Sequence, residues 1–118
     1  MKQIENLRKI SDARYMREQQ LIFPILEREA QLRRDIKRIE EFSTTQHDQS
    51  AMRSIGADVV WLGWVARTRH RLNTELANVL QQKEFHMGKV RKSFGKLKVI
   101  EAIEKQQIKA RQSKRDLP

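Results

Sequence analysis

The histidines and one pair of glutamates are the residues of this chain whose types could support chemistry. Histidine acts as a general acid or base or as a metal ligand, and paired carboxylates can share a proton transfer. The three histidines, His47, His70 and His86, are widely separated and do not form a metal-binding motif such as HExxH. Glu40 and Glu41 are adjacent, so their side chains diverge if the segment is helical. We therefore expect no catalytic residues, no bound metal and no cofactor.

Other catalytic signatures are missing from the sequence as well. The chain has no cysteine and no Gly-rich phosphate loop, and its serines lack a recognisable triad context. The absence of cysteine also excludes disulfides and fits a cytosolic protein. No stretch approaches the ~20 apolar residues of a membrane span, and the N-terminus lacks the apolar core of a signal peptide. We expect a soluble, unexported protein that is not an enzyme.

Positive charge is the strongest compositional signal. The formal net charge is +10, and it is concentrated between Lys83 and Arg115, where eleven basic residues stand against three acidic ones. Such a balance favours association with an acidic protein surface, nucleic acid or anionic lipid. A solvated helix face with a frayed tail is the competing interpretation.

Two long helices must position these residues. The 118 residues include only four Gly and two Pro, and the polar run from Ser43 to Ser50 is the one stretch typical of a turn. We predict an all-α fold, an elongated antiparallel two-helix coiled-coil hairpin with a longer second helix. The whole chain, 1–118, forms one domain, with helix 1 at about 2–45, the turn at about 46–49 and helix 2 at about 50–114.

Apolar residues spaced by three and four mark the packing face of helix 1. The clear part of this seam consists of Ile22, Ile25, Glu29, Leu32, Ile36 and Ile39. Earlier in the chain Arg14 and Glu18 interrupt an apolar face formed by Ile4, Leu7, Ile10 and Tyr15, which predicts weaker packing. Pro24 should kink or loosen the helix locally, because it removes one backbone hydrogen bond.

Helix 2 carries a similar pattern. Its apolar series is Leu72, Leu76, Val79, Leu80, Met87, Val90, Phe94, Leu97, Ile100, Ile103 and Ile108. Gly88 and Gly95 fall on one face, where they either admit a neighbouring chain or are merely tolerated. The stretch from Ile55 to Val65 is rich in residues that favour strands, but a lone strand has no partner here, so we assign it to the start of helix 2.

The predicted turn position implies an unpaired overhang at the end of helix 2. At 1.5 Å per residue, the first residues of helix 1 come level with roughly Arg91 to Phe94. Leu97, Ile100, Ile103 and Ile108 then cannot be buried within the hairpin and need another partner. The predicted contact surface at this end consists of Arg91, Lys92, Lys96, Lys98, Ile100, Ile103, Lys105, Lys109 and Arg111.

A second contact surface is predicted beside the turn, formed by Val60, Trp61 and Trp64. Tryptophan is enriched at interaction hot spots, whereas a small cluster that closes the hairpin is the alternative. We expect one of the two tryptophans to be exposed but not both, since Leu62 and Val65 can close the seam.

The segment from Arg91 to Lys105, a basic run leading into a Glu- and Lys-rich helix, resembles that of the FliJ-type proteins of the flagellar export apparatus and their YscO-like relatives in type III secretion. Those proteins are also small, basic, cysteine-poor helical hairpins that resemble the stalk of rotary ATPases. The resemblance implies a cytoplasmic stalk or chaperone component, peripheral to the inner membrane at the export apparatus. Its termini would bind the export ATPase ring and its tip the cytoplasmic part of an export-gate membrane component, and some members also escort export chaperones.

The chain departs from this family in its short length, in Pro24 and in the Trp61 and Trp64 pair. Two other functions remain open. A nucleic-acid-binding basic hairpin would explain the charge of +10, although only Phe85 and Phe94 lie among the basic residues as stacking platforms. A generic coiled-coil adaptor or homodimer is the third hypothesis.

Overall fold

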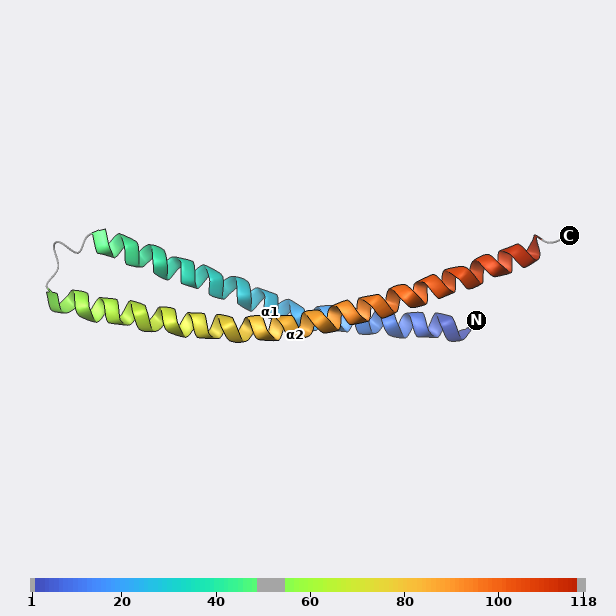
Figure 1. Cartoon of the computed structure of the whole chain (residues 1–118), viewed down its shortest axis with the longest axis horizontal. Coiled ribbons are helices and arrows are strands. Elements are labelled where there is room, and N and C mark those ends of the chain that lie inside the picture. Colours follow the sequence, from blue (N-terminus) through green and yellow to red (C-terminus); the bar gives the residue numbers. More distant parts are fainter. Residues whose placement is uncertain (1, 49–54, 117–118) are drawn as a thin grey trace. The chain divides into compact units, whose positions relative to one another are not determined.

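The structure, a computed structural model, describes the backbone of residues 2–48 and 55–116 and the side chains of residues 2–43 and 59–116. It consists of two helices, α1 (Lys2–Asp48) and α2 (Ile55–Arg115) (Figure 1). None of the described residues lies in a strand. The all-α prediction with a longer second helix is confirmed. Neither helix, over its described residues, has a segment long and apolar enough to cross a membrane.

The helix boundaries differ from those predicted at the turn. Because α1 continues to Asp48, residues 46–48 are helical and the helix end predicted at residue 45 is too early. The polar run that suggested a turn contains no glycine or proline, so nothing in it forces the helix to end. Residue 49 of the predicted turn and the predicted helix start at 50 lie outside the described residues. From Ile55 onward the strand-favouring stretch is helical, as predicted.

The chain divides into two units at Pro24 and Lys83. We call residues 1–23 with 84–118 the terminal unit and residues 24–83 the inner unit. Both helices run continuously across these positions, so Pro24 lies inside α1 without ending it. Each unit therefore pairs one part of α1 with one part of α2.

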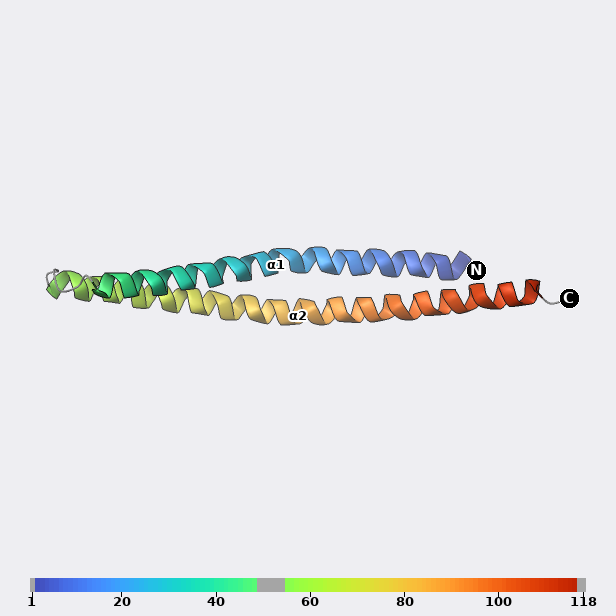
Figure 2. The same ribbon diagram turned by 90° about the horizontal axis from the view of Figure 1, so that it is seen from above.

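In the inner unit the two helices run antiparallel (Figures 1 and 2). The Arg28 guanidinium lies 2.7 Å from the Glu75 carboxylate, whereas Phe42, later in α1, meets Trp61, earlier in α2, with ring centroids 5.0 Å apart. The predicted seam of α1 is confirmed, because all of its members are buried or half-buried. Leu32 at its centre is fully buried.

In the terminal unit the helices also run antiparallel, but the packing is more polar. Arg8 approaches Glu104 to 2.8 Å, and the Tyr15 and Phe94 rings are 5.3 Å apart. The α1 positions that turn inward keep the spacing of three and four, and they are Ile4, Arg8, Ser11, Tyr15, Glu18 and Ile22. Leu7 and Ile10, predicted on the apolar face, are 49% and 64% exposed because Arg8 and Ser11 take the inward positions. Only Ile22 of this row is buried, so the weaker packing predicted for this part of α1 is observed.

The predicted overhang is too long. The Arg8 to Glu104 contact places the start of α1 opposite Glu104, well past the range Arg91 to Phe94. Leu97 is accordingly buried and Ile100 half-buried. The physical reason is that α1 continues beyond residue 45, which moves the pairing toward the C-terminal end of α2. Side chains are continuously exposed only from residue 105 to residue 116.

Candidate contact surfaces

The residues whose types could support chemistry do not form a metal-binding group in the described part of the chain. Within these residues no three His, Asp or Glu side chains come together in a way that could hold a metal ion. His70 is exposed in the inner unit, and His86 is half-buried in the terminal unit against the edge of the Phe85 ring. The side chain of His47 lies outside the described residues.

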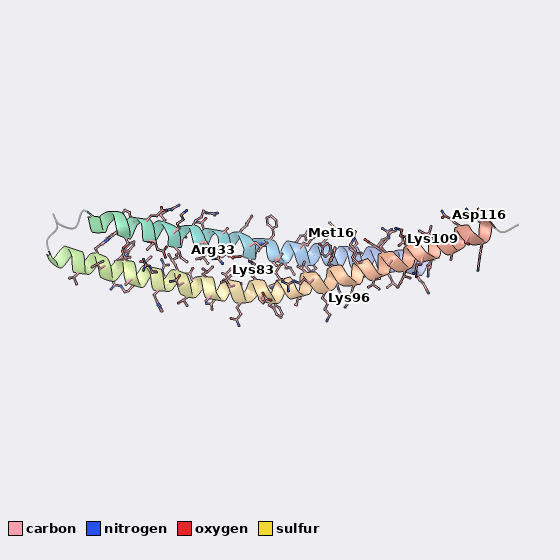
Figure 3. The ribbon with its side chains drawn as sticks, turned by 45° about the horizontal axis from the view of Figure 1, so that its top comes forward. Met16, Arg33, Lys83, Lys96, Lys109 and Asp116 are labelled. Atoms are coloured by element: carbon pink, nitrogen blue, oxygen red, sulfur yellow. The ribbon has the colours of Figure 1, made fainter. Side chains whose placement is uncertain are left out.

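The first surface is the basic one on α2 of the terminal unit. All seven of its predicted cations are exposed, and they are Arg91, Lys92, Lys96, Lys98, Lys105, Lys109 and Arg111. Figure 3 labels Lys96 on the side of α2 that faces away from α1. Of these cations only Lys98 forms an ion pair within the described residues, at 3.3 Å from Glu101. The surface therefore carries positive charge that the terminal unit does not neutralise.

The two apolar members of this surface behave differently. Ile100 turns toward α1 and is half-buried, so its predicted role in partner binding is not supported by its position. Ile103 is 41% exposed and Ile108 is 44% exposed. Ile108 lies among Lys105, Lys109 and Arg111, in the stretch from residue 105 to residue 116 where every described side chain is exposed. This C-terminal segment, residues 105–116, combines exposed apolar and basic side chains as expected for the overhang, but it is shorter.

A separate group of cations from both helices lies in the terminal unit. Arg14, Arg17 and Lys89 line an open groove of about 450 Å³ in the terminal unit, together with Glu18 and Leu21. From the sequence, Arg14 was predicted only as an interruption of the apolar face of helix 1. The signal that could have found the group is the spacing of three between Arg14 and Arg17, which places both on one side of the helix.

The second surface lies in the inner unit around the tryptophans. Trp61 is half-buried, edge-on to Phe42 at 5.0 Å and stacked on Trp64 at 5.2 Å. Trp64 is 44% exposed and Val60 is 70% exposed. As predicted, one tryptophan is open and the other is not.

The side chains around the tryptophans are only partly those predicted. Val65 is buried and closes the seam, but Leu62 is 53% exposed because positions 61 and 65 already occupy the inward face. Phe42, which covers Trp61, was missed. It comes three residues after Ile39 of the seam, so helical spacing alone could have placed it near α2.

Glu29 is the most buried charged residue in the described part of the chain, and its role is to pair with cations within the helix seam. The Lys83 ammonium lies 2.9 Å and the Arg33 guanidinium 3.0 Å from its carboxylate, and Figure 3 labels both cations. Hydrogen bonds, first from Lys83 and then from Arg33, lower the pKa of Glu29, while burial acts in the opposite direction. The carboxylate therefore remains ionised at neutral pH within an apolar seam.

Comparisons with protein-family models, with curated proteins and with solved structures find no match for this chain.

Proposed function

We propose that this protein is a non-enzymatic stalk or chaperone component of a flagellar or type III protein export apparatus. In this role it binds the export ATPase ring through its C-terminal basic surface and the cytoplasmic part of an export-gate component through the tryptophan surface. It would act in the cytoplasm, peripheral to the inner membrane, and export chaperones are further candidate partners. The observation that carries the proposal is the C-terminal segment, where exposed Ile108 lies among uncompensated cations.

This combination suits a protein partner with an acidic opening. Positive charge speeds the approach to an acidic surface and fixes orientation, whereas an apolar side chain that becomes buried supplies affinity. Lys105, Lys109 and Arg111 provide the charge, and Ile108 provides the apolar anchor. The tryptophan surface supplies a second site with different chemistry, which a component that bridges two partners requires.

Deletion of residues 105–118 tests the ATPase contact. Co-purification with a purified export ATPase ring should be lost, while circular dichroism should show that the remaining chain is still helical, since Leu97 and Ile100 keep their contacts. A larger deletion from residue 95 would remove buried Leu97 and confuse binding with folding. The matched charge variants are Lys109→Glu in the segment and Lys37→Glu on the exposed side of α1. Undiminished binding after the deletion would place the site elsewhere.

Single tryptophan variants test the second contact. Trp64→Ala should change the free energy of unfolding by less than about 1 kcal/mol, because the side chain is largely open, yet it should remove binding to the export-gate component. Trp61→Ala should destabilise by about 2–3 kcal/mol, since Trp61 loses contacts with both Phe42 and Trp64. Thermal unfolding with a pull-down measures both. Severe unfolding in both variants would make the pair part of the core and remove the site.

Nucleic-acid binding is the second candidate function, and the cations of Arg14, Arg17 and Lys89 around one groove favour it. Titration of binding to random-sequence duplex DNA against salt measures how many phosphates are neutralised. Tight, steeply salt-dependent binding together with no affinity for the ATPase would favour this function over export.

The third hypothesis, a homodimer or generic adaptor, is tested by mass measurement in solution.

A further inference from the structure

The outer face of α2 in the terminal unit carries a second row of positions spaced by three and four. Its members are Phe85, Gly88, Lys92, Gly95, Val99 and Ala102, and all are exposed. Its two large apolar members, Phe85 and Val99, are 62% and 60% exposed and lie near the two ends of the row. The inward positions of the same stretch, Ser93 and Leu97 among them, are buried against α1. The outer row is therefore separate from the row that builds the helix pair.

The two glycines of this outer face are not required by the fold. A Cβ atom at Gly88 or at Gly95 would meet nothing within 4 Å, and neither residue has a positive φ. Each glycine nevertheless costs the helix roughly 1 kcal/mol relative to alanine. The distance between two packed helices depends on the side chains at the contact, so glycine lets a second helix approach closely. Phe85 and Val99 then provide apolar area on either side of the close approach.

Charge indicates what kind of helix would fit. Lys89, Lys92 and Lys96 lie on or beside the outer face, and none of them forms an ion pair within the described residues. Of the acids near this face, Glu101 pairs with Lys98 and Glu104 with Arg8, which leaves Glu84 as the one nearby acid without an ion pair in the described residues. A second copy of this face would bring lysines against lysines, which is unfavourable. A helix that carries carboxylates beside its apolar residues would be attracted instead.

We propose that residues 85–102 of α2 form a docking surface for an acidic amphipathic helix of a partner protein. The small and apolar face of that helix packs over Gly88 and Gly95, and its carboxylates lie among Lys89, Lys92 and Lys96. This docking surface shares Lys92 and Lys96 with the basic surface, but it does not include the C-terminal segment 105–116 and does not require the partner to be an export ATPase. It also explains why glycine occupies positions 88 and 95, which neither packing within the chain nor backbone conformation requires.

A designed peptide provides the probe. It is a 28-residue helix with alanine and leucine at heptad positions and glutamate beside them, and a matched peptide carries lysine in place of glutamate. Fluorescence anisotropy with the full chain should show binding of the glutamate peptide only. Truncation after Glu104 should leave this binding intact, which separates the outer face from the proposed ATPase contact.

The double variant Gly88→Leu, Gly95→Leu is the decisive test. It removes no charge, it places leucines in open space and it raises helix propensity, so the fold should be retained by circular dichroism. Binding of the glutamate peptide should weaken at least tenfold, whereas Asn78→Leu, an exposed position of α2 in the inner unit, should have no effect. Binding to duplex DNA depends on the cations and should not change.

The opposite results would overturn the proposal. Unaltered peptide binding in the double leucine variant would show that close helix packing does not occur on this face. Equal binding of both peptides, or binding of DNA alone, would exclude an acidic helix as the occupant. Charge reversal by Lys92→Glu with Lys96→Glu provides an independent check that does not alter the glycines. This variant should lose the glutamate peptide and gain the lysine peptide, and retention of the original preference would contradict the proposed charge complementarity.

Discussion

The inner unit and the terminal unit use the same spacing of inward positions but fill it with different residues. In the inner unit Ile25, Leu32, Ile36 and Ile39 face α2, with Glu29 as the one charged member of the α1 row. In the terminal unit Arg8, Ser11 and Glu18 occupy half of the corresponding row. A heptad pattern can thus specify helix pairing with little apolar material. The inner unit supplies most of the buried seam on α1, while the terminal unit carries most of the exposed charge.

The largest expected loss of stability comes from the buried seam of the inner unit. Leu32→Ala in the inner unit removes a fully buried side chain and should lower the free energy of unfolding by about 2–5 kcal/mol. Ile10→Ala in the terminal unit removes an exposed side chain and should stay within about 0.5 kcal/mol. Urea unfolding followed by circular dichroism measures both. Similar losses from the two variants would show that the units do not differ in packing as described.

Acidification should weaken the inner unit through Glu29. Because its pKa is lowered in the folded state, its contribution to stability is complete well above the ordinary value of 4.5 and is lost as pH falls through the folded value below it. We expect a loss of about 1–2 kcal/mol from this group between neutral pH and pH 3.

Glu29→Gln isolates this contribution. The variant should be less stable at pH 7, because Lys83 loses its ionic partner, and its unfolding free energy should change less on acidification than that of the unmodified chain. Urea midpoints across the pH range give the comparison. An unchanged pH dependence in the variant would assign the effect to other carboxylates.

The smallest expected effect is a gain in stability, and it comes from an inward position of the terminal unit. Glu18 turns inward in the terminal unit, and its Oε2 atom is buried without a hydrogen-bond partner. Glu18→Leu should therefore stabilise by about 1 kcal/mol, since it replaces a poorly satisfied carboxylate with an apolar group. Glu27→Leu, at an exposed position, is the matched control and should have little effect. A loss of stability on Glu18→Leu would show that the Glu18 carboxylate makes favourable interactions in the folded protein. The inward row of the terminal unit would then be better packed than its polar residues suggest.

Periodicity predicted the helix pair and its best-packed stretch. The spacing from Ile22 to Ile39 identified the inward face, and it placed Glu29 within that face despite its charge. It failed for Leu7 and Ile10, because a row defined by apolar residues cannot reveal that Arg8 and Ser11 take the inward positions. Side-chain identity was a reliable guide to packing only where the seam is apolar.

The sequence pattern could not predict the length of the unpaired end of α2. Helix pairing depends on where the chain reverses, and no glycine or proline fixes the end of α1 at the predicted residue. An error of a few residues there shifted every later pairing, so Leu97 and Ile100 were assigned to an unpaired end. The lysines and arginines of the basic surface are exposed, because long cationic side chains stay in solvent under either pairing, whereas their role in partner binding stays a prediction.

Glu29 also has a consequence for how the helices can move along each other. Its principal cation, Lys83, is flanked one heptad away on either side by Leu76 and Val90, both apolar. If α1 slipped along α2 by seven residues in either direction, most apolar residues of α1 would still find apolar neighbours, but Glu29 would lie opposite Leu76 or Val90. The carboxylate would then keep only Arg33, a residue of its own helix, while Lys83 would lose its anion. Together with the Arg28 to Glu75 ion pair, the ionised Glu29 thus favours one axial alignment of the helices in the inner unit, and it opposes sliding under a load along them.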